Sequence, residues 1–305
     1  MPRGLACRGV SMTEAAAPFD RSLLDRRRLR AAAGAEPGAD FLLQAVAEEL
    51  VDRLSLVQRR FAVGVDLAGY GGQLAARLKA GGQVDHILRL ERDARFLREG
   101  ENGIVADEEA LPLRDESVDL VVSALSLHLT NDTPGAFVQI RRALRPDGLF
   151  LAALLGGETL NELRSSLVAA EAEIYGGASP RVAPFADMRD AGGLLQRTGF
   201  ALPVIDQDRL TVRYDTLFHL MRDLRAMGMT NVLRARSRRP VGRRLFLRAG
   251  EIYAERFADP DGRLRATFDI IYLSGWRPHD SQQKPLKPGS AQMSLAEALK
   301  PKPQG

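Results

Sequence analysis

Short apolar runs alternate with helical repeats along the first half of this chain. The run from Val118 to Leu125 is too short and too rich in β-branched residues for an ordinary helix, and a similar run follows the turn Pro146-Asp147-Gly148. Between the two runs, apolar residues recur at helical spacing while arginines occupy the other face, which predicts a crossover helix. Its apolar positions are Ala136, Phe137, Ile140 and Leu144. The segment therefore predicts a β-α-β unit with two parallel strands.

The same alternation precedes this unit. Apolar spacing predicts a helix from Phe41 to Leu56, a strand that starts at Phe61, and a short helix that follows Gly72 and runs through Lys79. Two further strands are expected at His86 to Glu91 and at Ile104 to Asp107. Nearly continuous apolar strands that alternate with helices predict a doubly wound, Rossmann-like α/β sheet with helices on both faces.

Beyond Gly157 the pattern changes to helices with a few closing strands. We expect helices at 159–175, 187–197, 217–227 and 245–257, and strands at 201–214 and 267–273. Residues 1–18 are expected to be a disordered lead-in, and residues 278–305 an extended tail with a short helix at 294–299. Residues 19–277 then form one domain, with a cofactor-binding half at about 40–156 and a half with helical insertions at about 157–277.

Composition narrows the class of protein. With 305 residues and 45% hydrophobic residues, the chain can bury a sizeable core. The single cysteine, Cys7, excludes a disulfide framework and any metal site built from several cysteines. No apolar run approaches the length of a membrane span, so we expect a soluble protein. Peripheral association with a membrane is left open.

The net charge of +4 comes from arginine clusters, the densest between Arg234 and Arg248. Clustered arginines can neutralise phosphates, but few aromatic residues interleave with these. Leu245, Ala249 and Ile252 share one helical face, so the cluster fits the solvated face of an amphipathic helix. Docking to an acidic protein remains an alternative, and no nucleic-acid partner is expected.

Candidate binding residues follow the first three predicted strands. The first strand ends in Asp66-Leu67-Ala68-Gly69-Tyr70-Gly71-Gly72, whose glycines allow close approach of a ligand to the backbone. Glu91 follows the second strand, where acidic residues of dinucleotide folds bind ribose hydroxyls. Asp107 and Glu108 follow the third strand, and Asp107 is placed to accept from an exocyclic amine. The alternatives are a solvated charge at Glu91 and a helix cap at Asp107.

These motifs resemble the successive motifs of class I S-adenosylmethionine-dependent methyltransferases. The segments that carry this resemblance are DLAGYGG, ADEEALPL, VDLVVSALSLHLTND and LRPDGLFL. The chain is most similar to the mitochondrial complex I assembly factor 5 family and its bacterial relatives. That closer resemblance rests on FDRSLL at Phe19, GGETLNELRSSL at Gly156 and GWRPHDSQQKPLKPGSA at Gly275.

The resemblance implies a seven-stranded sheet with an antiparallel last strand and S-adenosylmethionine as cofactor. Asp66, Gly69, Gly71 and Gly72 would face the methionine part, Glu91 the ribose, and Asp107 with Glu108 the adenine. The chain departs from the acidic-x-Gly-x-Gly-x-Gly pattern, because Ala68 and Tyr70 replace its first two glycines. We expect Gly69 and Gly71 to compensate by shifting the tight turn by one residue.

The same resemblance implies a function in assembly of NADH:quinone oxidoreductase, through hydroxylation of an arginine on an iron–sulfur subunit of complex I. Such a protein would lie in the cytoplasm of a bacterium or on the matrix side of a mitochondrion. Two alternatives stay open. One is a methyltransferase that acts on a small molecule or a carrier-bound acyl group, and the other is a non-enzymatic assembly chaperone with a decayed cofactor pocket.

Candidate catalytic residues are few. His128, Asn131 and Asp132 follow the fourth strand and could face a substrate, with His128 able to accept a proton near neutral pH. A packed or hydrogen-bonded edge residue is the alternative for His128. Only four histidines are present, and none forms a pair with the spacing of a non-haem iron site, so no bound metal is expected.

Overall fold

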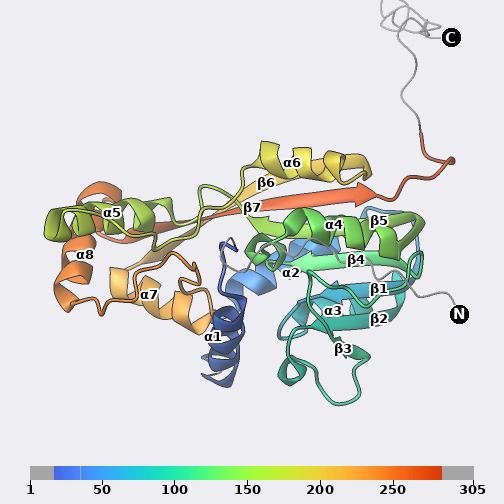
Figure 1. Ribbon diagram of the computed structural model, residues 1–305, viewed down its shortest axis with the longest axis horizontal. Coiled ribbons are helices and arrows are strands. Elements are labelled where there is room, and N and C mark those ends of the chain that lie inside the picture. The colour runs from blue at the N-terminus through green and yellow to red at the C-terminus, as the bar shows by residue number, and fades with distance from the viewer. Residues whose placement is uncertain (1–16, 35, 284–305) are drawn as a thin grey trace, which may run out of the picture.

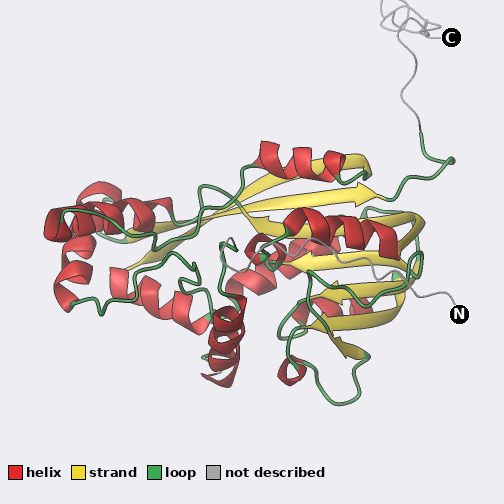
Figure 2. Cartoon of the chain, in the orientation of Figure 1, coloured by secondary structure: helices red, strands yellow, loops and turns green. Residues whose placement is uncertain are grey.

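The computed structural model describes residues 17–34 and 36–283, which form one mixed sheet flanked by helices (Figures 1 and 2). The sheet has seven strands in the order β3-β2-β1-β4-β5-β7-β6. Its first five strands are parallel, and β7 runs antiparallel to both β5 and β6. The strands are β1 Phe61–Leu67, β2 Val84–Glu91, β3 Gly103–Val105, β4 Val118–Ala124, β5 Leu144–Leu155, β6 Ala201–Tyr214 and β7 Leu264–Trp276. The predicted α/β fold with an antiparallel closing strand is confirmed.

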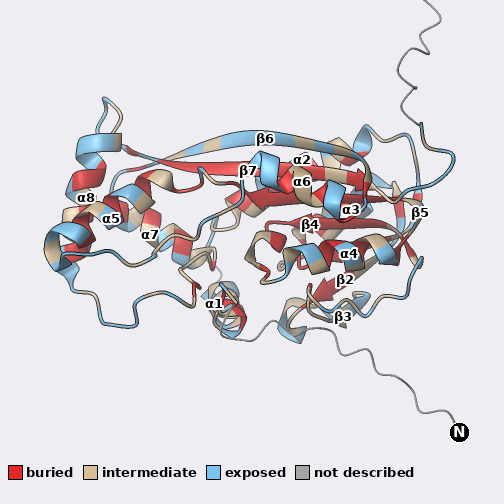
Figure 3. Ribbon diagram, turned by 45° about the horizontal axis from the view of Figure 1, so that its top comes forward, coloured by how far each residue is buried: buried red, intermediate tan, exposed pale blue. Residues whose placement is uncertain are grey.

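Helices cover both faces of this sheet, because alternate residues of the buried strands point to opposite sides. On one face α2 and α3 pack against β1 and β4, and on the other α4 and α6 pack against β4 and β5. Figure 3 shows the central strands buried and the edge strand β6 largely exposed. The helices are α1 Arg21–Gly34, α2 Phe41–Ser55, α3 Gln73–Gly81, α4 Thr133–Ala143, α5 Asn161–Tyr175, α6 Met188–Arg197, α7 Leu217–Ala226 and α8 Arg243–Phe257.

The long antiparallel pair of β6 and β7 extends beyond the parallel strands, and the insertion helices lie at its far end. There α5, α7 and α8 gather, and α1 lies between α7 and the carboxyl edge of the sheet (Figure 1). This end of the molecule therefore faces the loops that follow β1, β4 and β5.

The structure corrects two features of the sequence interpretation. Leu144 begins β5 rather than ending the preceding helix, and the predicted Pro146-Asp147-Gly148 turn lies inside β5 as an irregularity, with Asp147 at φ 63°. The helix α1 was not predicted at all. Its sequence is mostly arginine and alanine, and only Arg21 and Leu24 are buried, so it lacks the repeated apolar spacing that marks a helix.

Three expectations fall outside the described residues: most of the lead-in with Cys7, the helix at 294–299, and most of the tail. Within residues 17–34 and 36–283, no helix is long and apolar enough to cross a membrane.

The segment at Gly275 lies far from the predicted site, at the amino end of β5. The amide of Arg277 donates to the Gly148 carbonyl at 2.8 Å, and the Gln282 amide donates to the Asp147 carboxylate at 2.9 Å. His279 contacts Ser281 at 2.7 Å within the same loop. These contacts give the segment a structural role in closing the sheet.

Candidate functional site

The loop after β1 keeps the backbone conformation of the family's glycine-rich loop, although Ala68 and Tyr70 replace its first two glycines. Ala68, Tyr70 and Gly72 have positive φ values of 55°, 53° and 77°, so the three positions of the family pattern still carry the left-handed conformation. The expected shift of the turn by one residue is therefore wrong. Gly69 and Gly71 instead let the loop backbone pack directly against neighbouring side chains. A Cβ added at Gly69 would lie 2.3 Å from Asp66 Oδ1, and one added at Gly71 would lie 2.4 Å from the Gln73 side chain.

Beneath this loop, one buried arginine joins the acids that follow β1 and β2. Arg89 donates to Glu91 Oε1 at 2.8 Å and to the Tyr70 carbonyl at 2.7 Å, and it forms an ion pair with Glu101. Its Nε lies 3.5 Å from Asp66, whose two carboxylate oxygens have no hydrogen-bond partner among the described residues. Arg89 and both acids are at most 2% exposed.

Burial dominates the proton affinity of these two acids. Loss of water raises the pKa of Asp66 to about 6, although the Arg89 guanidinium opposes this change. Loss of water together with the Asp66 charge raises the pKa of Glu91 to about 9, and Arg89 again opposes it. Two buried carboxyl groups thus share one buried cation, and the Asp66 oxygens have no hydrogen-bond partner among the described residues, which favours a ligand that donates hydrogen bonds.

A second acidic cluster follows β3. Glu108 is 2% exposed and accepts from Ser126 Oγ at 2.7 Å and from Arg21. Asp107 is 38% exposed, lies 3.1 Å from Arg21, and pairs with Arg92. Burial would raise the pKa of Asp107, but the Glu109 amide and these two guanidinium groups hold it below its ordinary value. Both acids thus lie at the predicted edge, with arginine partners that the sequence did not reveal.

The amino-terminal segment closes this edge. The amide of Phe19 donates to Asn131 Oδ1 at 2.8 Å, and the amide of Asp20 donates to the Val232 carbonyl at 2.8 Å. Arg21 at the start of α1 then reaches Asp107 and Glu108. The FDRSLL resemblance was the one sequence signal that could have placed α1 at the site.

The three catalytic candidates have different surroundings. His128 lines a cavity, accepts from the Leu155 amide at 3.4 Å, and packs edge-on against Phe185. Burial and the neighbouring Arg28 charge lower the pKa of His128 to about 3, so the imidazole is neutral at physiological pH. The side chain of Asn131 accepts from the Phe19 amide and donates to the Phe19 carbonyl. Asp132 is exposed and caps α4 by accepting from the Gly135 amide at 2.8 Å.

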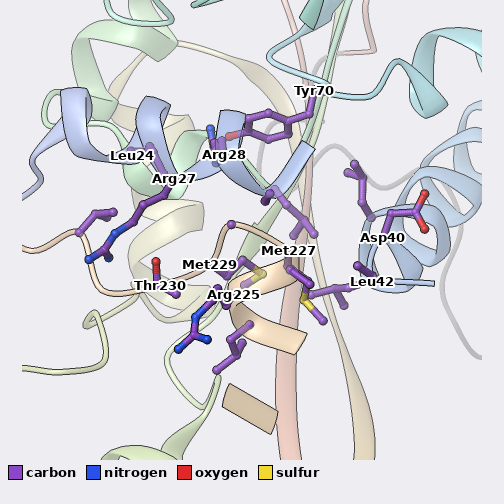
Figure 4. Close-up of a pocket in the computed structure, with 18 of the residues that line it drawn as sticks. Leu24, Arg27, Arg28, Asp40, Leu42, Tyr70, Arg225, Met227, Met229 and Thr230 are labelled. Carbon is purple, nitrogen blue, oxygen red and sulfur yellow. The ribbon is translucent and has the colours of Figure 1, made fainter. Parts of the chain in front are cut away.

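The cavity that contains His128 has a volume of about 870 Å³ and lies between α1, the start of α2, α5 and α7 (Figure 4). Tyr70 and Gly71 form part of its wall, and the guanidinium of Arg28 stacks on the Tyr70 ring at 3.7 Å. Thr159, Leu160 and other residues of the Gly156 segment line it as well. Two of the three segments that carry the family resemblance therefore meet around this space.

Comparison with known proteins agrees with this architecture. Residues 65–152 match the methyltransferase domain family. A crystal structure of protein BH2331 from Bacillus halodurans superposes with a TM-score of 0.54 at 14% identity, covering 77% of this chain and 100% of that one. At this low identity the likeness shows the fold, which is that of class I methyltransferases.

Curated relatives extend over most of the chain. The mitochondrial arginine-hydroxylase NDUFAF5 of Danio rerio is 38% identical over 92% of this chain and 89% of its own length, and the Homo sapiens protein is 38% identical over 96% and 87%. A malonyl-[acyl-carrier protein] O-methyltransferase of Laribacter hongkongensis is 33% identical over 87% of this chain and 94% of that protein. The chain therefore belongs to the NDUFAF5 arginine-hydroxylase family, a branch of the S-adenosylmethionine-dependent methyltransferase superfamily.

Proposed function

We propose that this chain binds S-adenosylmethionine and modifies an arginine side chain on an iron–sulfur subunit of complex I during assembly of NADH:quinone oxidoreductase. The similarity to NDUFAF5 along nearly the whole chain carries this proposal. The protein would act in the cytoplasm of a bacterium, or on the matrix side of a mitochondrion.

The residues present fit an adenosyl cofactor. The loop from Asp66 to Gly72 presents the left-handed backbone that brings main-chain amides close to a ligand, and Asp66 retains two buried oxygens without hydrogen-bond partners among the described residues. One carboxylate oxygen of Glu91 accepts a hydrogen bond from Arg89, and the other accepts none from the described residues. Asp107 and Glu108 would hold the adenine edge, where they now pair with Arg21 and Arg92. Cofactor binding at this edge would replace the contacts that Asp107 and Glu108 make with Arg21 and Arg92 by contacts with the adenine.

When bound, S-adenosylmethionine would supply an electrophilic methyl group, which serves methyl transfer. Addition of an oxygen atom to an arginine instead consumes dioxygen and two electrons from a reductant, which would have to enter as co-substrates. The chain's own contribution is to position the acceptor, because His128 faces the cavity as a neutral imidazole that accepts hydrogen bonds. Asn131 would keep the amino-terminal segment over the adenine edge, and Asp132 would fix the first turn of α4 beside it. Of the three candidates, we take His128 as the residue that would touch an acceptor, because it lines the cavity.

Mass spectrometry of the iron–sulfur subunit tests this function. The subunit should carry one added oxygen atom on an arginine in wild-type cells and lose that mass when the gene is deleted. A mass that stays unchanged after deletion would refute the proposal. Calorimetric titration of the purified protein with S-adenosylhomocysteine tests the cofactor separately, and binding should be lost in Glu91→Ala and weakened in Asp107→Ala.

A second candidate function is methylation of a carboxylate on a carrier-bound acyl group. The similarity to malonyl-[acyl-carrier protein] O-methyltransferase over 87% of the chain favours it, and so does the excess of arginines around the cavity. Transfer of labelled methyl groups from the cofactor to a malonyl-carrier protein would establish this activity.

A further inference from the structure

The cavity beside His128 combines an apolar interior with an unusual number of cations. Its walls include leucines and methionines from α1, α2, α5 and the turn after α7, among them Leu24, Leu42, Leu163, Leu167, Met227 and Met229. Six arginines line the same space, namely Arg27, Arg28, Arg95, Arg98, Arg181 and Arg225. The lining carboxylates are Glu36 and Asp40.

The carboxylates on the wall do not neutralise these arginines. Glu36 lies 3.6 Å from Arg222, which is outside the cavity wall, and Asp40 accepts from the side-chain amides of Gln44 and Gln73. Two of the arginines have acidic partners, since Arg181 pairs with Glu171 and Arg95 with Asp93. Positive charge is therefore in excess around this space. Arg27, Arg28 and Arg181 are half-buried, where electrostatic interactions are stronger than in water, whereas Arg95, Arg98 and Arg225 are exposed.

Two of the remaining arginines, Arg27 and Arg225, come from different helices that line the cavity. Arg27 of α1 donates to the carbonyl of Asn231, and Arg225 stands in the last turn of α7, five residues before Thr230. Figure 4 shows the guanidinium groups of Arg27 and Arg225 and the Thr230 hydroxyl on the same side of the space. Among the described residues, no carboxylate forms an ion pair with Arg27 or Arg225.

The surroundings of Arg27 favour an added anion. Burial and the nearby charges of Arg236 and Arg30 lower the pKa of Arg27, and Asp20 only partly compensates. Arg27 is half-buried, and a partly desolvated cation gains more from an anionic partner than a fully solvated one. A planar guanidinium suits a carboxylate or phosphate, which it binds through two parallel hydrogen bonds.

We infer that this cavity receives an acceptor segment with an apolar body and a carboxylate, and that Arg27 and Arg225 pair with the carboxylate. The inference rests on the proposed function in taking the cavity as the acceptor site. A lone arginine side chain would be repelled by the lining cations. The protein segment that presents the target arginine must therefore carry an aspartate or glutamate together with apolar residues. A carboxylate on an acyl chain shares this chemistry.

Small amphipathic probes test the charge preference directly. Calorimetry would compare sodium decanoate with decanamide and with decyltrimethylammonium, which share the apolar chain and differ in head-group charge. Decanoate should bind at least tenfold more tightly than decanamide, and the ammonium probe more weakly than either. The double variant Arg27→Gln/Arg225→Gln should lose this preference, whereas Arg209→Gln on the exposed face of β6 should keep it. Equal binding of decanoate and decanamide to the wild type would overturn the inference.

Two further measurements separate the remaining outcomes. Short apolar peptides that carry one arginine with either aspartate or asparagine identify the source of the carboxylate. Tighter binding of the aspartate peptide supports a protein segment, and equal binding of both peptides overturns that part of the inference. Titration of the same samples with S-adenosylhomocysteine reports on the proposed function separately, since its failure would leave the decanoate result unchanged. Thermal unfolding by circular dichroism verifies that each variant is folded.

Discussion

Replacement of Arg89 by methionine should destabilise this protein far more than loss of a surface arginine. The side chain of Arg89 is 2% exposed and faces Asp66 and Glu91, which are 0% and 1% exposed. Methionine fills a similar volume but leaves both carboxylates without their cation. Removal of one partner from a buried ion pair costs about 3–5 kcal/mol. We expect the free energy of unfolding to fall by about that amount.

Urea denaturation followed by circular dichroism would measure this loss. Arg60→Met is the matched control, because the pair between Arg60 and Asp85 has side chains that are 73% and 44% exposed and should contribute about 0–1 kcal/mol. The double variant Arg89→Met/Glu91→Gln should recover part of the stability, since the second change removes a buried acid that must be protonated on folding.

The loss should also depend on pH. The folded pKa of Asp66, about 6, lies above its ordinary value of 3.8, so the stability linked to this group is fully present below pH 3.8 and is lost as pH rises toward 6. Arg89 opposes this rise in pKa, so its removal should extend the loss to higher pH, and Arg89→Met should therefore be more destabilising at pH 8 than at pH 5.5. A cost below about 1 kcal/mol, or no recovery in the double variant, would refute the reasoning.

Three further predictions concern the loop, the histidine and the helix cap. Ala68→Gly should stabilise the protein by up to about 1 kcal/mol, because relief of a left-handed alanine exceeds the added entropy of the unfolded chain. Gly72→Ala should destabilise it in the same urea assay, since φ is 77° and Arg89 Nη1 lies 3.0 Å from the added carbon. The His128 imidazole signals in NMR should not titrate between pH 5 and 8, because its folded pKa is about 3 against an ordinary 6.5. Stability linked to His128 is therefore present above pH 6.5 and lost as pH falls toward 3, by at most about 1.4 kcal/mol per pH unit relative to His128→Asn. Asp132→Ala should cost about 0.5–2 kcal/mol while leaving cofactor binding of the folded protein unchanged, and a selective loss of binding would contradict the capping role.

The sequence predicts the parallel sheet well because buried strands such as β4 are continuous apolar runs, and the acids at strand ends follow from that placement. It does not predict the partners of those acids. In the sequence, Arg89 is only a polar residue within an apolar strand. Its pairing with Asp66 depends on the register between β1 and β2, which the sequence pattern does not give. Arg21 and Arg28 lie on a helix without apolar spacing, so only the folded chain brings them to the site.

The docking of the amino-terminal segment has a consequence for biosynthesis. The segment pairs Phe19 with Leu233, and Arg234 donates its amide to the Pro18 carbonyl at 2.9 Å. These contacts close a loop of more than two hundred residues, and non-local contacts of this kind form slowly. On the ribosome, the parallel strands can assemble before Leu233 has been synthesised. Docking of the amino-terminal segment is therefore completed only late in translation, and until then its contacts with Asn131, Asp107 and Glu108 must hold it at the acidic edge without those to the segment at Leu233.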